Sequence, residues 1–307
     1  MQKIRTITVC GPTASGKTGL GVELALRLDG EIISADSMQI YKGMDIATAV
    51  VKSEETKGVP HHMISFLDVD ESYSVSDYVK RAKSIIFDIS LRGKVPIIVG
   101  GTGLYIDTLV NNINFLENSN NSKVRENLKE RLENEGIEKL YTELCEIDFS
   151  AAEKIHPNNS VKVLRALEIY YSSGKTLSEQ NDLSKNEESP FNNIFICLSA
   201  RERDFLYERI NKRVDTMLEE GLVEEAKKYF LKNSGSTSSQ AIGYKELKPY
   251  IDDELPLDEC VENLKRATRR YAKRQLTWFR RNEKMNWFYI DDYNDVSELA
   301  DEVMKIL

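Results

Sequence analysis

The sequence predicts an α/β fold in which a parallel sheet carries helices on both faces. Short apolar strands alternate with amphipathic helices in the N-terminal third, and polar motifs follow the strands. Two polar stretches bracket a helical segment further on, which predicts an inserted all-helical subdomain. With 307 residues, 41% of them hydrophobic, the chain is long enough to bury a substantial core in one or two domains.

The first predicted strand, residues 5–10, leads through a glycine-rich loop into a predicted helix at 19–28. The loop reads Gly11-Pro12-Thr13-Ala14-Ser15-Gly16-Lys17-Thr18, which has the P-loop spacing G-x-x-x-x-G-K-S/T. Backbone N–H groups at such a helix start form an anion site, to which Lys17 adds charge, and Thr18 is placed to coordinate Mg²⁺. An accidental match in a glycine turn is the alternative. The flanking strand and helix favour a polyphosphate site in a P-loop NTPase-like core.

Two further strands are predicted at 31–35 and 95–99, with a helix at 76–91 between them and a loop at 59–62. Asp36 ends the first of these strands, and Gly100, Gly101 and Thr102 follow the second. Ligands of parallel sheets bind beyond the carboxyl ends of the strands, so we expect the P-loop, Asp36 and Thr102 to face one crevice.

Asp36 has three possible roles: it could bind Mg²⁺ through water, cap the next helix, or act as a base. Capping is the common use of an Asp-Ser pair, but the position opposite the P-loop favours catalysis about equally. A nucleotide kinase usually has a Mg²⁺-binding Asp after an apolar strand, whereas the strand at 95–99 is followed by glycines and Thr102. The ligand of the P-loop therefore need not be ATP.

The polar stretches at 111–122 and 172–193 are predicted to be flexible joints around a helical segment at 123–171, after which a strand resumes at 193–198. We therefore predict a discontinuous catalytic core, residues 1–112 and 191–307, and an inserted helical subdomain, residues 113–190.

The last third is predicted to be mainly helical, with a helix at 204–220, a loop at 234–239, a strand at 287–290 and a closing short helix. Arg209 and Arg213 lie four residues apart, hence on one helix face. Most helical arginines only face solvent. A diphosphate needs more positive charge than Lys17 supplies, however, so at least one of the two is expected to bind it.

The formal net charge of −8 argues against a nucleic-acid partner, but the charges are segregated. Nine Lys and Arg residues lie between Lys265 and Lys284, which is typical of a surface that follows a phosphodiester backbone. The alternative is that these arginines pair with acids of the core. Tyr271, Trp278 and Phe279 in this segment are expected to be core anchors rather than base-stacking residues.

Several features exclude other classes of protein. The four cysteines are scattered, which indicates reduced thiols rather than a zinc site or disulfides. His61 and His62 are adjacent, and adjacent side chains seldom converge on one metal ion. No run is long enough to span a membrane and no signal peptide is visible, so we expect a cytoplasmic protein.

These motifs, in this order, resemble the bacterial tRNA dimethylallyltransferases, also called tRNA isopentenyltransferases. The resemblance spans nearly the whole chain and is carried by the P-loop, Asp36-Ser37-Met38-Gln39-Ile40-Tyr41, Pro60-His61-His62, Gly100-Gly101-Thr102-Gly103-Leu104-Tyr105, Arg165-Ala166-Leu167-Glu168, Gln240-Ala241-Ile242-Gly243-Tyr244-Lys245 and Tyr271-Ala272-Lys273-Arg274-Gln275-Leu276-Thr277-Trp278-Phe279.

The resemblance implies transfer of a dimethylallyl group from dimethylallyl diphosphate to N6 of adenosine 37 in the anticodon loop of tRNA. Diphosphate would be released and Mg²⁺ required, and the enzyme is expected to be a monomer that acts without a membrane. Two alternatives stay open: an adenylate isopentenyltransferase acting on free AMP, ADP or ATP, and a P-loop small-molecule kinase. A non-catalytic RNA-binding module would leave the anion site without a purpose.

The same resemblance assigns roles to individual residues. Asp36 would be the general base, with Thr102 and Lys17 also catalytic and Thr18 at the metal. The residues implied to bind diphosphate are Gly11, Thr13, Ala14, Ser15, Gly16, Lys17, Thr18, Arg209 and Arg213. Those implied to contact tRNA are Asp36, Ser37, Met38, Gln39, Thr102, Arg125, Ser160, Val161, Lys162, Val163, Leu164, Gln240, Gly243, Tyr244 and Lys245. Lys162 stands where many relatives have arginine.

Overall fold

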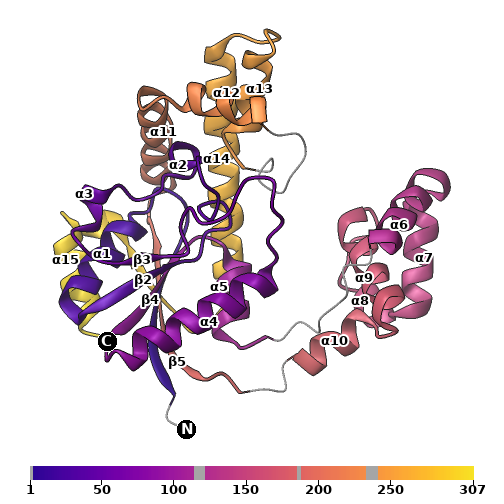
Figure 1. Cartoon of the computed structure of the whole chain (residues 1–307), viewed down its shortest axis with the longest axis horizontal. Helices are drawn as coiled ribbons and strands as arrows, with labels where there is room; N and C mark the ends of the chain where they lie inside the picture. The colour runs from indigo at the N-terminus through magenta and orange to yellow at the C-terminus, as the bar shows by residue number, and fades with distance from the viewer. Residues whose placement is uncertain (1–2, 114–121, 185–187, 233–240) are drawn as a thin grey trace. The chain divides into compact units, whose positions relative to one another are not determined.

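The structure of the protein is a computed structural model that describes residues 3–113, 122–184, 188–232 and 241–307 (Figure 1). The chain divides into two compact units. One comprises Met1–Val110 and Pro190–Leu307, and the other comprises Asn111–Ser189.

The larger unit is built on a parallel sheet with the strand order β3-β2-β4-β1-β5-β6. Its strands are β1 (Ile4–Cys10), β2 (Gly30–Ser34), β3 (His61–His62), β4 (Val95–Gly100), β5 (Phe191–Ser199) and β6 (Met285–Tyr289). This confirms the predicted parallel sheet. The prediction of a loop at 59–62 was wrong for His61 and His62, which pair with Ile32 and Ile33 of β2. Two residues are too few to show the alternation that identifies a strand.

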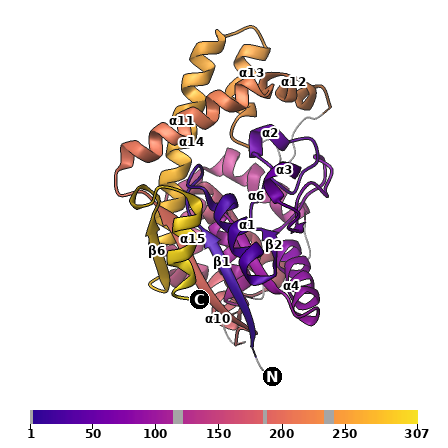
Figure 2. The same cartoon turned by 90° about the vertical axis from the view of Figure 1, so that its left-hand side faces the viewer.

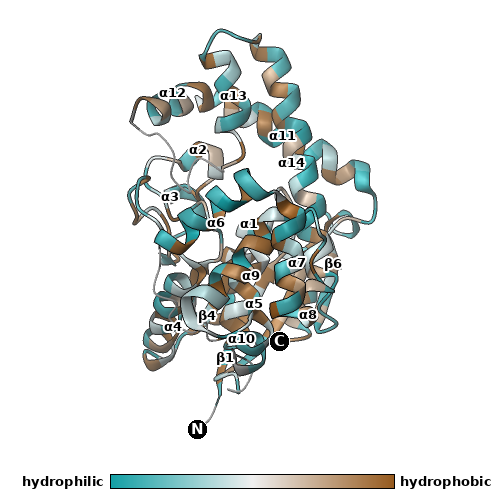
Figure 3. Cartoon of the chain, turned by 90° about the vertical axis from the view of Figure 1, so that its right-hand side faces the viewer, coloured by the Kyte–Doolittle hydropathy of each residue, from teal (hydrophilic) through white to brown (hydrophobic). Residues whose placement is uncertain are grey.

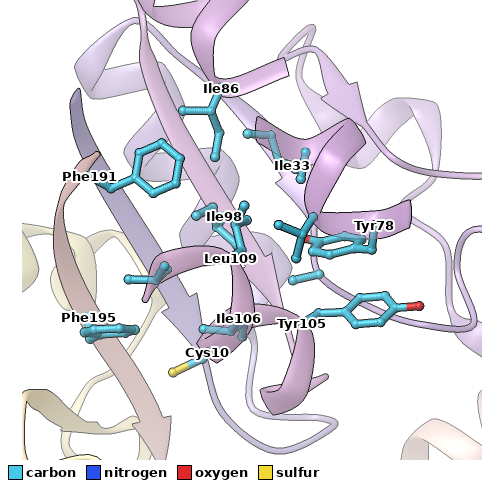
Figure 4. Packing of buried hydrophobic residues seen from close by; sticks show 14 of the residues in the cluster. Cys10, Ile33, Tyr78, Ile86, Ile98, Tyr105, Ile106, Leu109, Phe191 and Phe195 are labelled. Atoms are coloured by element: carbon cyan, nitrogen blue, oxygen red, sulfur yellow. The ribbon is translucent and has the colours of Figure 1, made fainter. Parts of the chain in front are cut away.

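Helices cover both faces of this sheet, as predicted. On one face lie α1 (Lys17–Leu28) and α15 (Val296–Met304), and on the other lie α4 (Val75–Leu91) and α5 (Gly103–Val110). Neighbouring residues of a strand point to opposite faces, so Ile97 packs with α1 while Ile98 packs with α4 and α5. Figure 4 shows the second of these cores, with Ile98 close to Leu109 and Ile33.

A further group of helices stands beyond the carboxyl ends of the strands (Figure 2). Its members are α11 (Arg203–Glu219), α12 (Leu222–Lys232), α13 (Tyr244–Ile251) and α14 (Leu257–Phe279). The segment after β2, which contains α2 (Asp45–Thr48), shares their core through Ile40, Tyr41 and Met44; α3 (Ser53–Thr56) follows. The 3-10 helix η2 (Ile290–Asp292) follows β6. The loop predicted at 234–239 lies outside the described residues.

The smaller unit is helical. It contains α6 (Ser122–Glu135), α7 (Ile137–Ile147), α8 (Phe149–Ala152), α9 (Ser160–Ser173) and α10 (Leu177–Ser184). Along these helices Figure 3 shows hydrophobic and hydrophilic residues in alternation, and Leu128, Leu140 and Leu167 are among the buried ones. The joint predicted at 172–193 was wrong in part, because it contains α10 and the start of β5. Asp148 holds α10 by accepting the N–H of Ser178 at 2.9 Å.

In the described part of the chain, none of the helices combines the length and the apolar content that crossing a membrane requires.

Candidate active site

The P-loop turns sharply between β1 and α1. Gly11 has φ +137°, and a Cβ there would lie 2.5 Å from the carbonyl oxygen of Leu198, so only glycine fits this position. Ala14 also has a positive φ, 62°, which is uncommon for a residue with a side chain. The Ser15 hydroxyl donates to the carbonyl oxygen of Pro12 at 2.8 Å and closes the turn. The loop thus has the compact form that its spacing predicts.

Two cationic side chains meet at this loop. The Lys17 ammonium donates to the carbonyl oxygen of Pro12 at 2.6 Å. Burial, and then the charge of Arg213, lower the pKa of Lys17 to about 8. Burial also lowers the pKa of Arg213, which the Asp36 charge opposes. An anion bound beside these cations would favour the charged forms of Lys17 and Arg213 and so raise both lowered pKa values. The site is therefore electrostatically suited to a phosphate group.

Lys17, Arg213 and Asp36 line one cavity of about 360 Å³. Thr13, Thr18, Ser37 and Gln39 add polar groups to the same cavity. Its apolar lining consists of Ile32, Met38, Ala47, Ala49, Val51, Ile64, Val99, Val214, Met217, Leu222, Ala241, Ile242 and Leu264. The arrangement suits a ligand with an anionic end and a small hydrocarbon part.

Asp36 follows β2 and is partly buried. Its Oδ1 accepts the N–H of Met38 at 2.9 Å, which closes a local turn. Asp36 does not cap the next helix, which was one of its possible roles, because α2 begins only at Asp45. It also lines the cavity with the P-loop, as expected. Thr102 instead supports the cavity wall: its Oγ1 accepts the N–H of Ser37 at 3.0 Å, and its own N–H donates to Ala35 at 3.0 Å.

Arg209 and Arg213 both approach the P-loop, by different routes. Arg213 lines the cavity. Arg209 is exposed and donates from Nε to the carbonyl oxygen of Ala14 at 2.9 Å. Its guanidinium lies 3.8 Å from the point that a Cβ on Gly16 would occupy. The predicted spacing of the two arginines therefore brings both to the anion site.

Helix α14 contributes five residues to the cavity lining that were not predicted as site residues: Leu264, Thr268, Tyr271, Arg274 and Gln275. Tyr271, expected to be a core anchor, lines the cavity, and burial and then the Asp36 charge raise its pKa. Gln275 is 5% exposed; its Oε1 accepts the N–H of Thr13 at 2.9 Å and its Nε2 donates to Gly101 at 3.0 Å. A Cβ on Gly101 would lie 2.1 Å from Nε2, which explains the glycine. Tyr271 and Gln275 lie four residues apart, which places both on one helix face. This spacing was the feature of the sequence from which their shared position could have been predicted.

Among the residues implied to contact tRNA, Gly243 and Lys245 line the cavity, but Tyr244 does not. The Tyr244 side chain is fully buried, and its hydroxyl donates to Glu225 at 2.9 Å, so it is a core residue instead. Gln240 lies outside the described residues.

Of the residues of the helical unit that were implied to contact tRNA, some are exposed and others are buried. Arg125 on α6 and Lys162 on α9 are exposed, and the Val161 side chain is 78% exposed. Val163 is fully buried in the core of the unit, so its side chain offers no surface to RNA. Ser160 and Leu164 are half-buried, and Leu164 packs against the same core.

The basic helix contains both paired and unpaired cations. The Lys265 ammonium lies 2.7 Å from the Asp215 carboxylate, and Arg269 donates to the side-chain oxygen of Asn211 at 2.6 Å. Arg266, Arg270 and Lys273 are exposed and form no ion pair within the described residues. Trp278 and Phe279 pack into the core, as expected.

His61 and His62 have separate partners. The Nδ1 of His61 hydrogen-bonds to the carbonyl oxygen of Val59 at 2.8 Å, and the Nε2 of His62 lies 2.8 Å from a Glu31 oxygen. His61 lines the cavity.

The chain is similar to known proteins of one family. The model of the IPP transferase family matches residues 39–282. A curated relative from Caldanaerobacter subterraneus, named tRNA dimethylallyltransferase, is 47% identical over 99% of this chain and 98% of its own length. A relative of the same name from Bacillus subtilis is 49% identical over 92% of this chain and 90% of its own length.

Solved structures are similar over the same extent. The tRNA delta(2)-isopentenylpyrophosphate transferase of Staphylococcus epidermidis matches with a TM-score of 0.72 and 44% identity, covering 99% of both chains. A eukaryotic dimethylallyltransferase acting on tRNA matches with a TM-score of 0.83 and 30% identity, covering 98% of this chain and 78% of its own. On the extent of these matches, the chain belongs to the IPP transferase family.

Proposed function

We propose that this enzyme transfers a dimethylallyl group from dimethylallyl diphosphate to N6 of adenosine 37 in tRNA and releases diphosphate. One observation carries the proposal: a single cavity presents the Asp36 carboxylate, the Lys17 and Arg213 cations, and an apolar wall. The names of the curated relatives and of the structural neighbours support a dimethylallyl donor and a tRNA acceptor.

The cations act on the leaving group. As the bond between the allylic carbon and the diphosphate oxygen breaks, negative charge grows on that oxygen and positive charge grows on the carbon. Lys17, Arg213 and the P-loop N–H groups are already oriented by the fold, so they stabilise the oxygen charge with little reorganisation. Arg209, held at Ala14, adds charge at the outer side of the loop.

Asp36 acts on the acceptor. The new bond joins the allylic carbon to N6 of adenine, and the carboxylate takes the proton that N6 loses. The hydrogen bond from Met38 to Oδ1 fixes the orientation of this carboxylate. Adenine must leave its stack to reach the cavity, which costs a few kcal/mol and least in a single-stranded loop.

Mg²⁺ fits the oxygen groups present. In the described chain no three His, Cys, Asp or Glu side chains converge as a metal cluster, so a cation here would share its ligands with the diphosphate. The Thr18 hydroxyl lines the cavity and is a hard oxygen donor, the kind that Mg²⁺ prefers. When bound, Mg²⁺ would offset negative charge on the departing diphosphate.

The test is incubation with dimethylallyl diphosphate, Mg²⁺ and either unmodified tRNA or AMP, followed by mass analysis of nucleosides. We expect N6-dimethylallyl adenosine in tRNA, and none in a matched tRNA with guanosine at position 37. Prenylated AMP would favour the adenylate isopentenyltransferase, and a phosphorylated product from labelled ATP would favour the kinase. Either result without tRNA prenylation contradicts the proposal.

A further inference from the structure

The short helix α2 forms part of the cavity wall through Ala47, Thr48 and Ala49, although the last of these is its C-cap. A helix of four residues has little stability of its own, because helix nucleation is costly and few hydrogen bonds repay it. The position of this wall therefore depends on groups that hold α2 from outside.

Glu225 of α12 holds the start of α2. Its Oε2 accepts the N–H of Ile46 at 2.8 Å, and its Oε1 accepts the N–H of Ala47 at 2.9 Å. These are two of the N–H groups that the first turn of a helix leaves without internal partners. Figure 3 shows α2 next to α12, as these contacts require.

The same carboxylate ties α2 to α13. Oε1 also accepts the hydroxyl of Tyr244, which is fully buried at the first position of α13, at 2.9 Å. Gly243, one residue earlier, lines the cavity and faces α2 closely: a Cβ on Gly243 would lie 3.5 Å from the Ala47 Cβ. Glu225 thus fixes the separation of two wall segments.

Gln39 holds the other end of α2. Its Nε2 donates to the carbonyl oxygens of Thr48 at 3.1 Å and Ala49 at 3.2 Å, while its Oε1 accepts the Ser34 hydroxyl at 2.9 Å. With both ends held, the methyl groups of Ala47 and Ala49 sit at fixed places on the apolar wall, near Val51 in sequence.

We infer that Glu225 is a positioning residue which, through α2, limits the length of hydrocarbon chain that the donor pocket accepts. The inference rests on the proposed function, because it takes the apolar wall to face the allyl group of the donor. Loosening α2 should let the wall yield to a longer chain and should hold the five-carbon donor less well. A purely structural role of Glu225 would lower stability and leave donor preference unchanged.

The experiment compares Glu225→Gln with Glu224→Gln, its neighbour, whose exposed carboxylate pairs with Lys227 at 3.0 Å. Glu225→Gln keeps the side-chain volume but turns one acceptor into a donor that faces a backbone N–H. kcat/KM is measured for dimethylallyl diphosphate and for geranyl diphosphate, a ten-carbon allylic donor, with the same tRNA. Thermal melting of each variant is measured in parallel.

We expect the ratio of kcat/KM for dimethylallyl diphosphate to kcat/KM for geranyl diphosphate to fall roughly tenfold in Glu225→Gln. A change of this size is within the range of discrimination that one methylene group causes in a hydrophobic pocket. KM for dimethylallyl diphosphate should rise and KM for tRNA should stay constant, with Glu224→Gln like the wild type. Unchanged donor preference in a folded Glu225→Gln variant overturns the inference.

If Glu225→Gln does not fold, the Ala47→Gly variant tests the inference instead. It removes one methyl from the wall and leaves both holding contacts in place, so it should relax the donor preference in the same direction. An unchanged preference in Ala47→Gly then overturns the inference. A wild-type chain that leaves tRNA unmodified contradicts the proposed function and the inference together, whereas an active wild type with unresponsive variants contradicts only the inference.

Discussion

The Oε1 atom of Gln275, in the last part of α14, accepts the backbone N–H of Thr13 in the P-loop at 2.9 Å. The Nε2 of the same side chain donates to Gly101 at 3.0 Å. One buried amide therefore connects the P-loop with the loop that follows β4. The two loops supply the anion site and the support for Asp36, so their separation matters for catalysis.

Gln275→Ala should weaken dimethylallyl diphosphate binding. It leaves the N–H of Thr13 and the carbonyl of Gly101 without partners, and an unsatisfied buried polar group costs about 1–3 kcal/mol. We expect KM for the donor to rise roughly tenfold, since 1.4 kcal/mol is a factor of ten. Steady-state kinetics measure this, with Thr277→Ala, an exposed change on the same helix, as control. Equal KM values for the two variants would show that the connection has no role in binding the donor.

Asp36→Asn should remove most of the chemical step. The amide keeps the shape of the side chain and can still accept from Met38, but it cannot take the N6 proton. General-base catalysis typically contributes about 10²–10⁴-fold, and we expect a loss in that range in single-turnover prenylation. tRNA affinity should change little. A single-turnover rate within a few-fold of the wild type would assign Asp36 to the turn contact with Met38 alone.

Donor affinity should depend on pH through Lys17. Its pKa in the free protein is about 8, lowered by burial and by Arg213. Bound diphosphate favours the charged ammonium and so raises that pKa. Affinity should therefore be full below pH 8 and should fall above it, approaching tenfold per pH unit until the pKa of the complex is reached.

Calorimetric titration with dimethylallyl diphosphate between pH 6.5 and 9.5 would reveal this decline. Lys17→Ala should bind more weakly and lose the dependence. A wild-type affinity that stays level across this range would mean that Lys17 does not bind the diphosphate in its ammonium form.

The features that the sequence predicted best are local ones. The P-loop is specified by residues adjacent in the chain, and β4 and β5, which flank β1 in the sheet, contain apolar runs that mark them as buried strands. The positions of these elements, and the crevice containing Asp36, therefore followed from local sequence. β3 was missed because its two residues gain their strand geometry only from pairing with Ile32 and Ile33. Tyr271 and Gln275 were missed for a similar reason: only tertiary packing brings α14 to the P-loop.

The sequence motifs contain both buried packing residues and accessible residues that can contact a ligand. Tyr244 and Val163 stand in segments implied to contact tRNA, yet both side chains are fully buried. Their neighbours Lys245 and Lys162 are accessible. A motif can therefore contain residues kept for packing next to residues that meet a ligand, and burial separates the two.

The exposed cations of α14 provide the last prediction. Arg266, Arg270 and Lys273 face solvent, whereas Lys265 and Arg269 are held by Asp215 and Asn211. Exposed cations that neutralise RNA phosphates release the counterions condensed on the RNA, so tRNA affinity should fall steeply with salt despite the acidic net charge.

Replacing Arg266, Arg270 and Lys273 together with Gln should weaken tRNA binding and flatten its salt dependence. For each RNA phosphate that the variant no longer neutralises, the slope of log K against log salt should fall by roughly 0.7 to 0.9. Affinity for dimethylallyl diphosphate should stay constant, because none of the three lines the cavity. Filter binding at several salt concentrations measures the slope, with Lys265→Gln, a paired position, as the comparison. If the folded triple variant keeps the wild-type slope, α14 is not an RNA-binding surface, and the exposed Arg125 and Lys162 of the helical unit become the positions to substitute next.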